Sequence, residues 1–155
     1  LNLSNSEIEM PTAKDNYGVN LAASDAEVVI NIKNTKITAY QCVNIYGNNR
    51  TVNIDNCQFI SRNMHNVKYF GGCVTLFENS SANITINNTS MTVEETEGYV
   101  TNGFVVIGSA LGDPNVGLMT INGCTANGKN FSAENVKKRA AVEVIISIDG
   151  TNFTK

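Results

Sequence analysis

Charged residues are scarce in this chain, and neither sign forms a block that would define a partner. They make up 16% of the 155 residues, and the formal net charge is −3. A protein that binds nucleic acid through its phosphates needs a basic field, which this composition does not supply. No apolar run approaches the roughly 20 residues that span a bilayer. We therefore expect no nucleic-acid partner and no membrane span.

The motifs of catalysis and metal binding are also missing. His65 is the only histidine, and the four cysteines form neither a CxxC pair nor a Cys/His cluster, so the sequence shows no zinc site. There is no GxSxG motif and no phosphate-binding Gly loop. Carboxylates are thinly spread, whereas calcium needs six or more oxygen ligands. We expect no catalytic residue, no metal and no cofactor.

What the sequence does contain is one eight-residue phrase, repeated six times. Its pattern is apolar–x–apolar–x–(Asn or Gly)–(Ser, Thr or Cys)–x–apolar. The copies are LNLSNSEI at 1, INIKNTKI at 30, VNIDNCQF at 52, ITINNTSM at 84, MTINGCTA at 119 and ISIDGTNF at 146. A fixed phrase separated by loops of variable length is typical of a repeat architecture.

The fifth position of the phrase predicts a sharp bend between two strands. Apolar residues alternate with polar ones before it, as in a strand with one buried face. Asn and Gly both tolerate the left-handed backbone region, where one residue turns the chain sharply. We interpret six residues as structural bends: Asn5, Asn34, Asn56, Asn88, Gly123 and Gly150.

A shorter apolar–x–apolar phrase completes a three-strand unit. It occurs as VNL at 19, VNI at 43, VTL at 74, VVI at 105 and VEV at 142. Three short strands per unit with an Asn bend are typical of a parallel β-helix, in which stacked coils share one core. An antiparallel β-sandwich is the alternative, but it gives no reason for Asn or Gly at one phrase position six times.

The phrase resembles the coils of the right-handed parallel β-helix in the pectin-lyase-like superfamily. The resemblance implies an all-β solenoid of about five to six coils, and we expect a single β-helix domain over residues 1–155. Because neither end shows an obvious polar cap, we expect a fragment of a longer solenoid that could self-associate through its ends. That superfamily contains lyases, hydrolases and surface proteins, so the fold alone does not decide the function.

The cysteines leave two alternatives open. Cys42 and Cys73 both precede the short phrase in adjacent coils, which could suit a disulfide. The other reading is that they are buried free thiols packing as small apolar groups. Cys57 and Cys124 share one phrase position two coils apart, roughly 10 Å at the usual strand spacing, and cannot bond.

The loops that enter the short phrase give the candidate binding surface. Four of them carry a Tyr, and the longer ones also carry basic residues. Aromatic rings beside polar groups on loops are suited to sugars or protein partners. The candidate ligand-binding residues are Tyr17, Tyr40, Tyr69, Tyr99, Arg62, His65 and Lys68. Alternatively, each Tyr ring covers the edge of the core with its hydroxyl pointing out.

The sequence supports three functional hypotheses. The first is a non-catalytic module of a secreted or cell-surface bacterial protein that binds a polysaccharide or a host or cell-surface glycan and acts as an adhesin. The second is a polysaccharide lyase or glycoside hydrolase, which would need paired carboxylates or a carboxylate with a base at a groove. The third is a structural stalk that self-associates.

Overall fold

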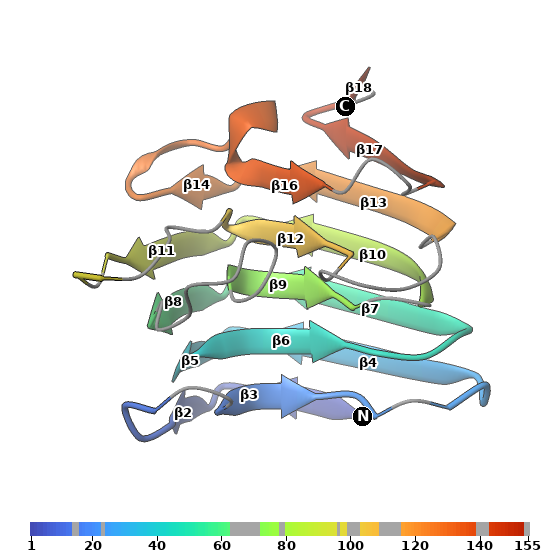
Figure 1. Ribbon diagram of the computed structural model, residues 1–155. Helices are drawn as coiled ribbons and strands as arrows, with labels where there is room; N and C mark the ends of the chain where they lie inside the picture. The colour runs from blue at the N-terminus through green and yellow to red at the C-terminus, as the bar shows by residue number, and fades with distance from the viewer. Residues whose placement is uncertain are drawn as a thin grey trace.

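The strands of this protein form three sheets around one core (Figure 1). The computed structural model describes residues 1–13, 16–22, 24–62, 72–77, 80–95, 97–98, 103–108, 116–138 and 143–153. Sheet A contains β1 (Asn2–Ser4), β4 (Val28–Lys33), β7 (Arg50–Asp55), β10 (Ser81–Asn87), β13 (Val116–Asn122), β17 (Glu143–Ile148) and β18 (Thr151–Phe153). Sheet B contains β2 (Glu7–Glu9), β5 (Lys36–Ala39), β8 (Gln58–Arg62), β11 (Ser90–Glu94), β14 (Thr125–Ala126) and β15 (Lys129–Asn130). Sheet C contains β3 (Tyr17–Asn20), β6 (Gln41–Ile45), β9 (Gly72–Leu76), β12 (Val105–Ile107) and β16 (Val136–Lys138).

Each winding of the chain adds one strand to each sheet, and the strands stack in parallel. In sheet A, Ile30 lies opposite Val52, and Val52 lies opposite Ile84. These residues come from the first apolar position of the phrase, and all are at most 2% exposed. Because side chains alternate across a strand, the apolar positions form columns inside the stack. The protein is an all-β parallel solenoid, which confirms the predicted fold class.

The number of coils is smaller than expected. The solenoid has about four turns, whereas five to six were predicted from the repeats. The windings that begin at β1, β4, β7 and β10 each supply one parallel strand to every sheet. After β14 the chain instead forms the antiparallel β15 and the short 3₁₀ helix η1 (Ala133–Asn135) before it reaches β16. The fifth copy of the phrase therefore builds a winding that β15 and η1 interrupt, and the sixth copy leads into an antiparallel hairpin.

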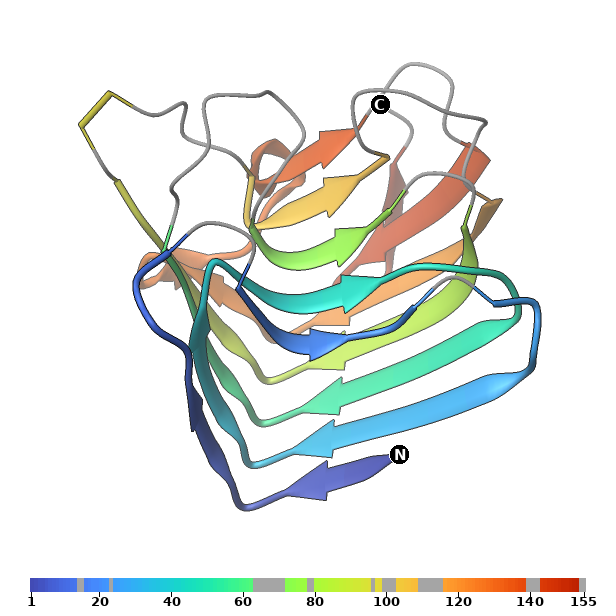
Figure 2. The same ribbon diagram turned by 60° about the horizontal axis from the view of Figure 1, so that its bottom comes forward.

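The corner between sheets A and B is formed by one left-handed residue in each winding, and these corners stack in one column (Figure 2). The backbone φ angles are 51° at Asn5, 49° at Asn34, 51° at Asn56, 49° at Asn88 and 60° at Gly123. The Asn34 amide donates to Asn5 Oδ1 at 3.1 Å, and the Asn56 amide donates to Asn34 Oδ1 at 2.8 Å. Side chains as well as backbone thus bond one winding to the next.

The sixth phrase position closes this corner through a local hydrogen bond. The Thr35 hydroxyl donates to the carbonyl of Lys33 at 2.9 Å, and the Thr89 hydroxyl donates to the carbonyl of Asn87 at 2.8 Å. Cys57 makes the equivalent S–H contact with the carbonyl of Asp55 at 3.3 Å. A short side chain with a hydrogen to donate can reach the carbonyl two residues earlier. This requirement explains why only Ser, Thr or Cys occupies the position.

The sixth copy of the phrase does not make the predicted bend. Asp149 and Gly150 have φ angles of 46° and 79°, and they join β17 to β18 as an antiparallel hairpin. Asp-Gly favours the two-residue turn that matches the twist of a hairpin. Asn127 and Gly128, with φ angles of 46° and 75°, likewise join β14 to β15. Gly150 therefore turns the chain within a hairpin and not at a coil corner.

The fifth copy of the short phrase was also misassigned. Val144 was predicted in a strand of sheet C, but it lies in β17 of sheet A, opposite Gly117. The fifth strand of sheet C is β16, whose Val136 lies opposite Val105. The described residues contain no α-helix that could cross a membrane.

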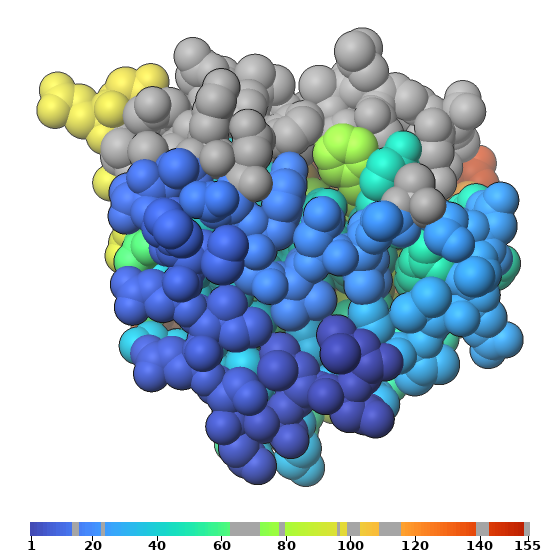
Figure 3. Space-filling model, turned by 90° about the horizontal axis from the view of Figure 1, so that it is seen from below, coloured from blue at the N-terminus to red at the C-terminus, as the bar shows by residue number. Residues whose placement is uncertain are grey.

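The N-terminal end of the stack differs from the C-terminal end. β1, β2 and β3 form one edge of each sheet, and this first winding lies at the face seen from below (Figure 3). Leu1 is 65% exposed there, and Leu3 and Ile8 pack against the core while remaining partly exposed. The outer edge of each of these strands leaves its backbone groups without a strand partner among the described residues.

Candidate functional site

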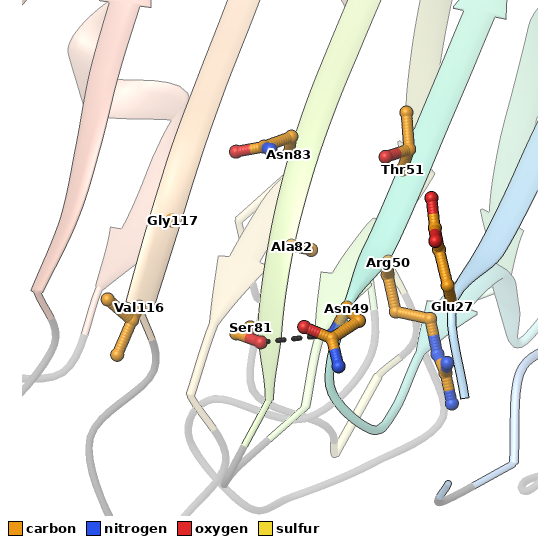
Figure 4. A pocket seen from close by; sticks show the side chains of 9 residues that line it. All are labelled: Glu27, Asn49, Arg50, Thr51, Ser81, Ala82, Asn83, Val116 and Gly117. Atoms are coloured by element: carbon orange, nitrogen blue, oxygen red, sulfur yellow. Dashed lines mark hydrogen bonds between the residues drawn. The ribbon is translucent and has the colours of Figure 1, made fainter. Parts of the chain in front are cut away.

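A polar groove lies on sheet A, where β7, β10 and β13 begin (Figure 4). Its volume is about 380 Å³. The lining residues are Glu27, Asn49, Arg50, Thr51, Ser81, Ala82, Asn83, Val116 and Gly117. They come from four successive windings, so the groove runs across the strands along the axis of the stack.

Three polar side chains of the groove are available to a ligand. Glu27 and Asn83 are exposed and Thr51 is half-buried. Glu27 precedes β4, Thr51 lies on β7 and Asn83 lies on β10, and Thr51 is directly opposite Asn83. None of the three side chains has a hydrogen-bond partner within the described part of the chain, so their polar atoms are free to meet a polar ligand.

Arg50 holds one wall of the groove in place. It is only 2% exposed, although a charged side chain is rarely buried without partners. Its guanidinium donates to the carbonyls of Tyr46 at 3.2 Å, Ser24 at 2.8 Å and Ala22 at 3.2 Å, and also to the carbonyl of Ala26. These bonds attach the segment that carries Glu27 to the start of β7.

Two serines connect the next pair of windings at the same corner. The Ser80 hydroxyl accepts from the Gly47 N–H at 3.0 Å, and the Ser81 hydroxyl accepts from the Asn49 N–H at 3.1 Å (Figure 4). The Asn49 amide in turn donates to the carbonyl of Asp25 at 3.0 Å. The backbone of the groove is thus fixed by contacts that have no equivalent among the described residues of the other windings.

Gly117 allows two strands to approach closely at the floor of the groove. Its φ is +145°, and a Cβ at this position would lie 1.9 Å from the carbonyl oxygen of Ala82. Any other residue would have to push β13 away from β10. The groove therefore depends on a glycine here.

An apolar rim continues the groove toward the C-terminal end. Val116, Leu118 and Ile145 point outward from sheet A, and they are 48%, 45% and 60% exposed. Leu118 lies opposite Asn83 on one side and Ile145 on the other. From Thr51 onward, the outer face of the sheet thus changes from polar to apolar along one column of side chains.

The predicted Tyr surface is only partly within the described residues. Tyr40 is fully buried and its ring meets that of Tyr17 edge-on at 6.5 Å, so Tyr40 covers the core rather than facing a ligand. Arg62 bonds to Glu9 at 2.8 Å and to the carbonyl of Met10. Tyr69, Tyr99, His65 and Lys68 lie outside the described residues.

An aromatic pair that the sequence did not single out lies near the groove corner. Tyr46 follows β6 and Phe77 follows β9, and their rings meet edge-on at 5.0 Å. The chain reaches Asn49 and Ser81 of the groove within a few residues of them. The repeat analysis overlooked these residues because neither belongs to a recurring phrase.

A second depression, of about 440 Å³, follows the corner between sheets A and B. Its amide residues Asn34 and Asn56 bond to each other at 2.8 Å, which leaves them less able to bind a ligand than the groove side chains. Within the described residues, no three His, Cys, Asp or Glu side chains gather where they could hold a metal ion.

Comparison with known proteins found no matching family model, no matching curated protein and no matching solved structure. The fold supports the resemblance to β-helix proteins only at the level of a β-solenoid. The function is therefore argued from the groove on sheet A.

Proposed function

We propose that this chain is a non-catalytic β-solenoid module of a secreted or cell-surface bacterial protein, related to the pectin-lyase-like superfamily, and that it binds a glycan in the groove on sheet A. One observation carries the proposal. Glu27, Thr51 and Asn83 offer unpartnered polar atoms on neighbouring windings, beside an exposed apolar rim. A sugar has hydroxyls on its edge and C–H groups on its faces, so a surface with both characters is suited to it.

The spacing of the stack favours an extended ligand. Neighbouring strands lie about 4.8 Å apart, so Thr51 and Asn83 present polar atoms at about this interval. A polysaccharide that lies along the solenoid axis would meet Thr51 and Asn83 on two windings and the apolar side chain of Leu118 on the next. Binding on several weak, regularly spaced contacts is consistent with an adhesive role.

The charge of the groove favours a neutral glycan over an acidic one. Glu27 is exposed, and the cation nearest to it in the lining, Arg50, is buried and donates to backbone carbonyls. The whole chain carries a net charge of −3. An acidic sugar would be repelled by the carboxylate without gaining an exposed cation in the lining.

A glycan array with the purified chain, followed by calorimetric titration of the best neutral oligosaccharide, tests the proposal. Asn83→Ala and Glu27→Gln should each weaken binding by about 5- to 20-fold, the usual loss when one polar contact is removed. Asn53→Ala is the matched control, because Asn53 is exposed on the same sheet outside the groove and should change the affinity less than about twofold.

The Tyr surface predicted from the sequence provides the opposing outcome. If Tyr69→Ala and Tyr99→Ala abolish binding while Asn83→Ala leaves it intact, the glycan site lies at those loops and not on sheet A. If no glycan on the array binds, the glycan proposal is wrong.

Self-association through the first winding is a second candidate function. β1, β2 and β3 form the edge of all three sheets at the N-terminal end, and Leu1 is 65% exposed there. An open strand edge can pair with another chain. Sedimentation velocity should show a concentration-dependent dimer that Ile8→Lys dissociates, and a monomer at every concentration would refute this role.

A further inference from the structure

Cys42 and Cys73 occupy the same place in neighbouring windings of sheet C. Gln41 lies opposite Gly72 and Val43 lies opposite Val74, so the two cysteines face each other across β6 and β9. Both side chains are fully buried in the core. Adjacent parallel strands are about 4.8 Å apart, and a disulfide needs a Cα separation of roughly 4.4–6.8 Å. The backbone therefore does not have to move far for a bond to form.

All four cysteines are free and buried, and Cys42 and Cys73 lie side by side on neighbouring strands. Each sulfur also contacts a backbone carbonyl at 3.4 Å, that of Ile37 for Cys42 and that of Thr92 for Cys73. Burial, and then the contact with Cys73, raises the pKa of Cys42 well above its ordinary value. The folded Cys42 thiol is thus protonated at neutral pH and reacts slowly, because the thiolate is the nucleophile.

We propose that Cys42 and Cys73 form a disulfide when the chain folds in the presence of an oxidising low-molecular-weight disulfide, such as oxidised glutathione. In the first step one cysteine thiolate attacks this disulfide, forms a mixed disulfide and releases one glutathione thiolate. In the second step the other cysteine thiolate attacks the mixed disulfide, forms the Cys42–Cys73 bond and releases the second glutathione thiolate. The protein loses two protons and two electrons, and glutathione disulfide is reduced to two glutathione thiols.

The other two cysteines provide an internal control. Cys57 and Cys124 also share one position of the repeat, but Thr89 lies between them in the intervening winding. The Cys57 N–H donates to the Thr89 hydroxyl at 3.2 Å, and the Thr125 N–H donates to the Thr89 carbonyl at 3.1 Å. With a whole strand between them, Cys57 and Cys124 cannot approach to bonding distance. If burial alone decided which cysteines are oxidised, Cys57 and Cys124 would react in the same way as Cys42 and Cys73.

The bond would join the two windings that lead into the groove. β6 continues to Tyr46 and Asn49, and β9 continues to Phe77 and Ser81. Because the cross-link lies at the start of β6 and β9, it would limit their separation without occupying the groove itself. The disulfide and the glycan site are independent, so either can fail without the other.

Refolding of the full chain from urea in a glutathione redox buffer tests the proposal. After quenching with an alkylating agent, the wild-type protein should be lighter than its fully alkylated form by the mass of two alkyl groups, and peptide mapping should find Cys42 joined to Cys73. The cross-linked protein should melt about 5–10 °C above the same sample treated with a reducing agent, as expected for a cross-link in a domain of this size. Cys57→Ser and Cys124→Ser should behave like the wild type.

Three results would overturn the proposal. They are a wild-type protein with four alkylated cysteines after refolding, a peptide map that joins any other pair, and a melting shift of equal size in Cys42→Ser. The wild-type peptide map decides the question by itself if a serine variant fails to fold.

Discussion

The two corners that lead into and out of sheet A are built in opposite ways. The exit corner, from sheet A to sheet B, uses one left-handed residue in each of five windings, with φ between 49° and 60°. The entry corner, from sheet C to sheet A, has no recurring residue among those that the structure describes, and it is held by Arg50, Ser80 and Ser81. The hydrogen-bonded side-chain amides of Asn5, Asn34 and Asn56, called the amide ladder below, lie at the exit corner. The groove lies at the entry corner.

If the groove binds the proposed glycan, this difference separates the residues that stabilise the stack from those that contact the ligand. Residues that recur at one position can only form contacts that recur, such as the bond from Asn56 to Asn34. A binding site needs side chains that stay unpartnered, such as Glu27 and Asn83. They can remain so because contacts made elsewhere by unique residues fix the backbone beneath them.

Replacing Arg50 should disrupt the entry corner and cause the largest loss of unfolding free energy among these variants. Arg50→Ala leaves the carbonyls of Ala22, Ser24, Ala26 and Tyr46 without their donor, and should lower the free energy of unfolding by about 3 kcal/mol or more. Arg50→Lys keeps the charge but cannot reach four carbonyls, so an intermediate loss is expected. Urea denaturation monitored by circular dichroism measures both. Equal stability of wild type and Arg50→Ala would contradict the role given to this side chain.

A methyl group at Gly117 should damage the floor of the groove. Gly117→Ala places a Cβ against the Ala82 carbonyl, and the loss of stability should be about 2–3 kcal/mol because β13 must move. Gly128→Ala is the matched control. Gly128 also has a positive φ, 75°, but nothing lies within 4 Å of its Cβ position, so only the backbone strain of about 1 kcal/mol remains. If both variants lose the same amount, the close approach at Gly117 is unimportant.

A single change at the exit corner should cost less than one at the entry corner. Asn56→Ala forces alanine into the left-handed region and removes an amide from the ladder, for a loss of about 1.5 kcal/mol. Asn56→Gly keeps the backbone conformation and loses only the ladder contacts, about 0.5 kcal/mol. Thermal unfolding of the two variants measures the difference, and a glycine variant less stable than the alanine variant would show that backbone strain is not the main cost.

The smallest effect is expected at the exposed pair of Lys36 and Glu7, just after the exit corner. The ammonium donates to Glu7 at 2.6 Å, and this hydrogen bond, followed by the charge of Glu7, raises the pKa of Lys36 above 10.5. The contribution of this ion pair to folding stability is therefore fully present below the unfolded-state pKa of Lys36. It is lost as the pH rises through the higher folded-state pKa of Lys36. Urea midpoints of wild type and Glu7→Gln should differ slightly at pH 8, and the difference should shrink as the pH rises through the folded-state pKa of Lys36. A difference that grows with pH would have the wrong sign.

The sequence predicted the exit corner well because its physical cause is local. A left-handed bend needs only Asn or Gly, so five of the six bend positions could be identified from residue type alone. Gly150 was assigned wrongly because Asp149-Gly150 is also a strong hairpin signal, and it prevailed over the phrase. Val144 was placed in the wrong sheet because apolar–x–apolar patterns do not identify the sheet to which a strand belongs.

The groove could not be predicted in the same way, because its residues interact with segments far away in the sequence. One signal was present, since Arg50 stands two positions before Val52, on the inward side of the same strand. A charged residue at an inward position needs special partners. The identity of these partners, carbonyls of the preceding winding, depends on how a loop folds and not on the repeat. Gly117 gave no signal, because its close neighbour Ala82 lies on another strand.

Amide chemical shifts of the ¹⁵N-labelled chain, recorded during titration with the best neutral oligosaccharide from the array, test the central claim most directly. The account predicts that shifts concentrate at the entry corner, at Asn49, Ser81, Asn83 and Gly117, while the amides of Asn34 and Asn56 at the exit corner stay unchanged. Shifts concentrated at the exit corner, with an unchanged entry corner, would contradict it.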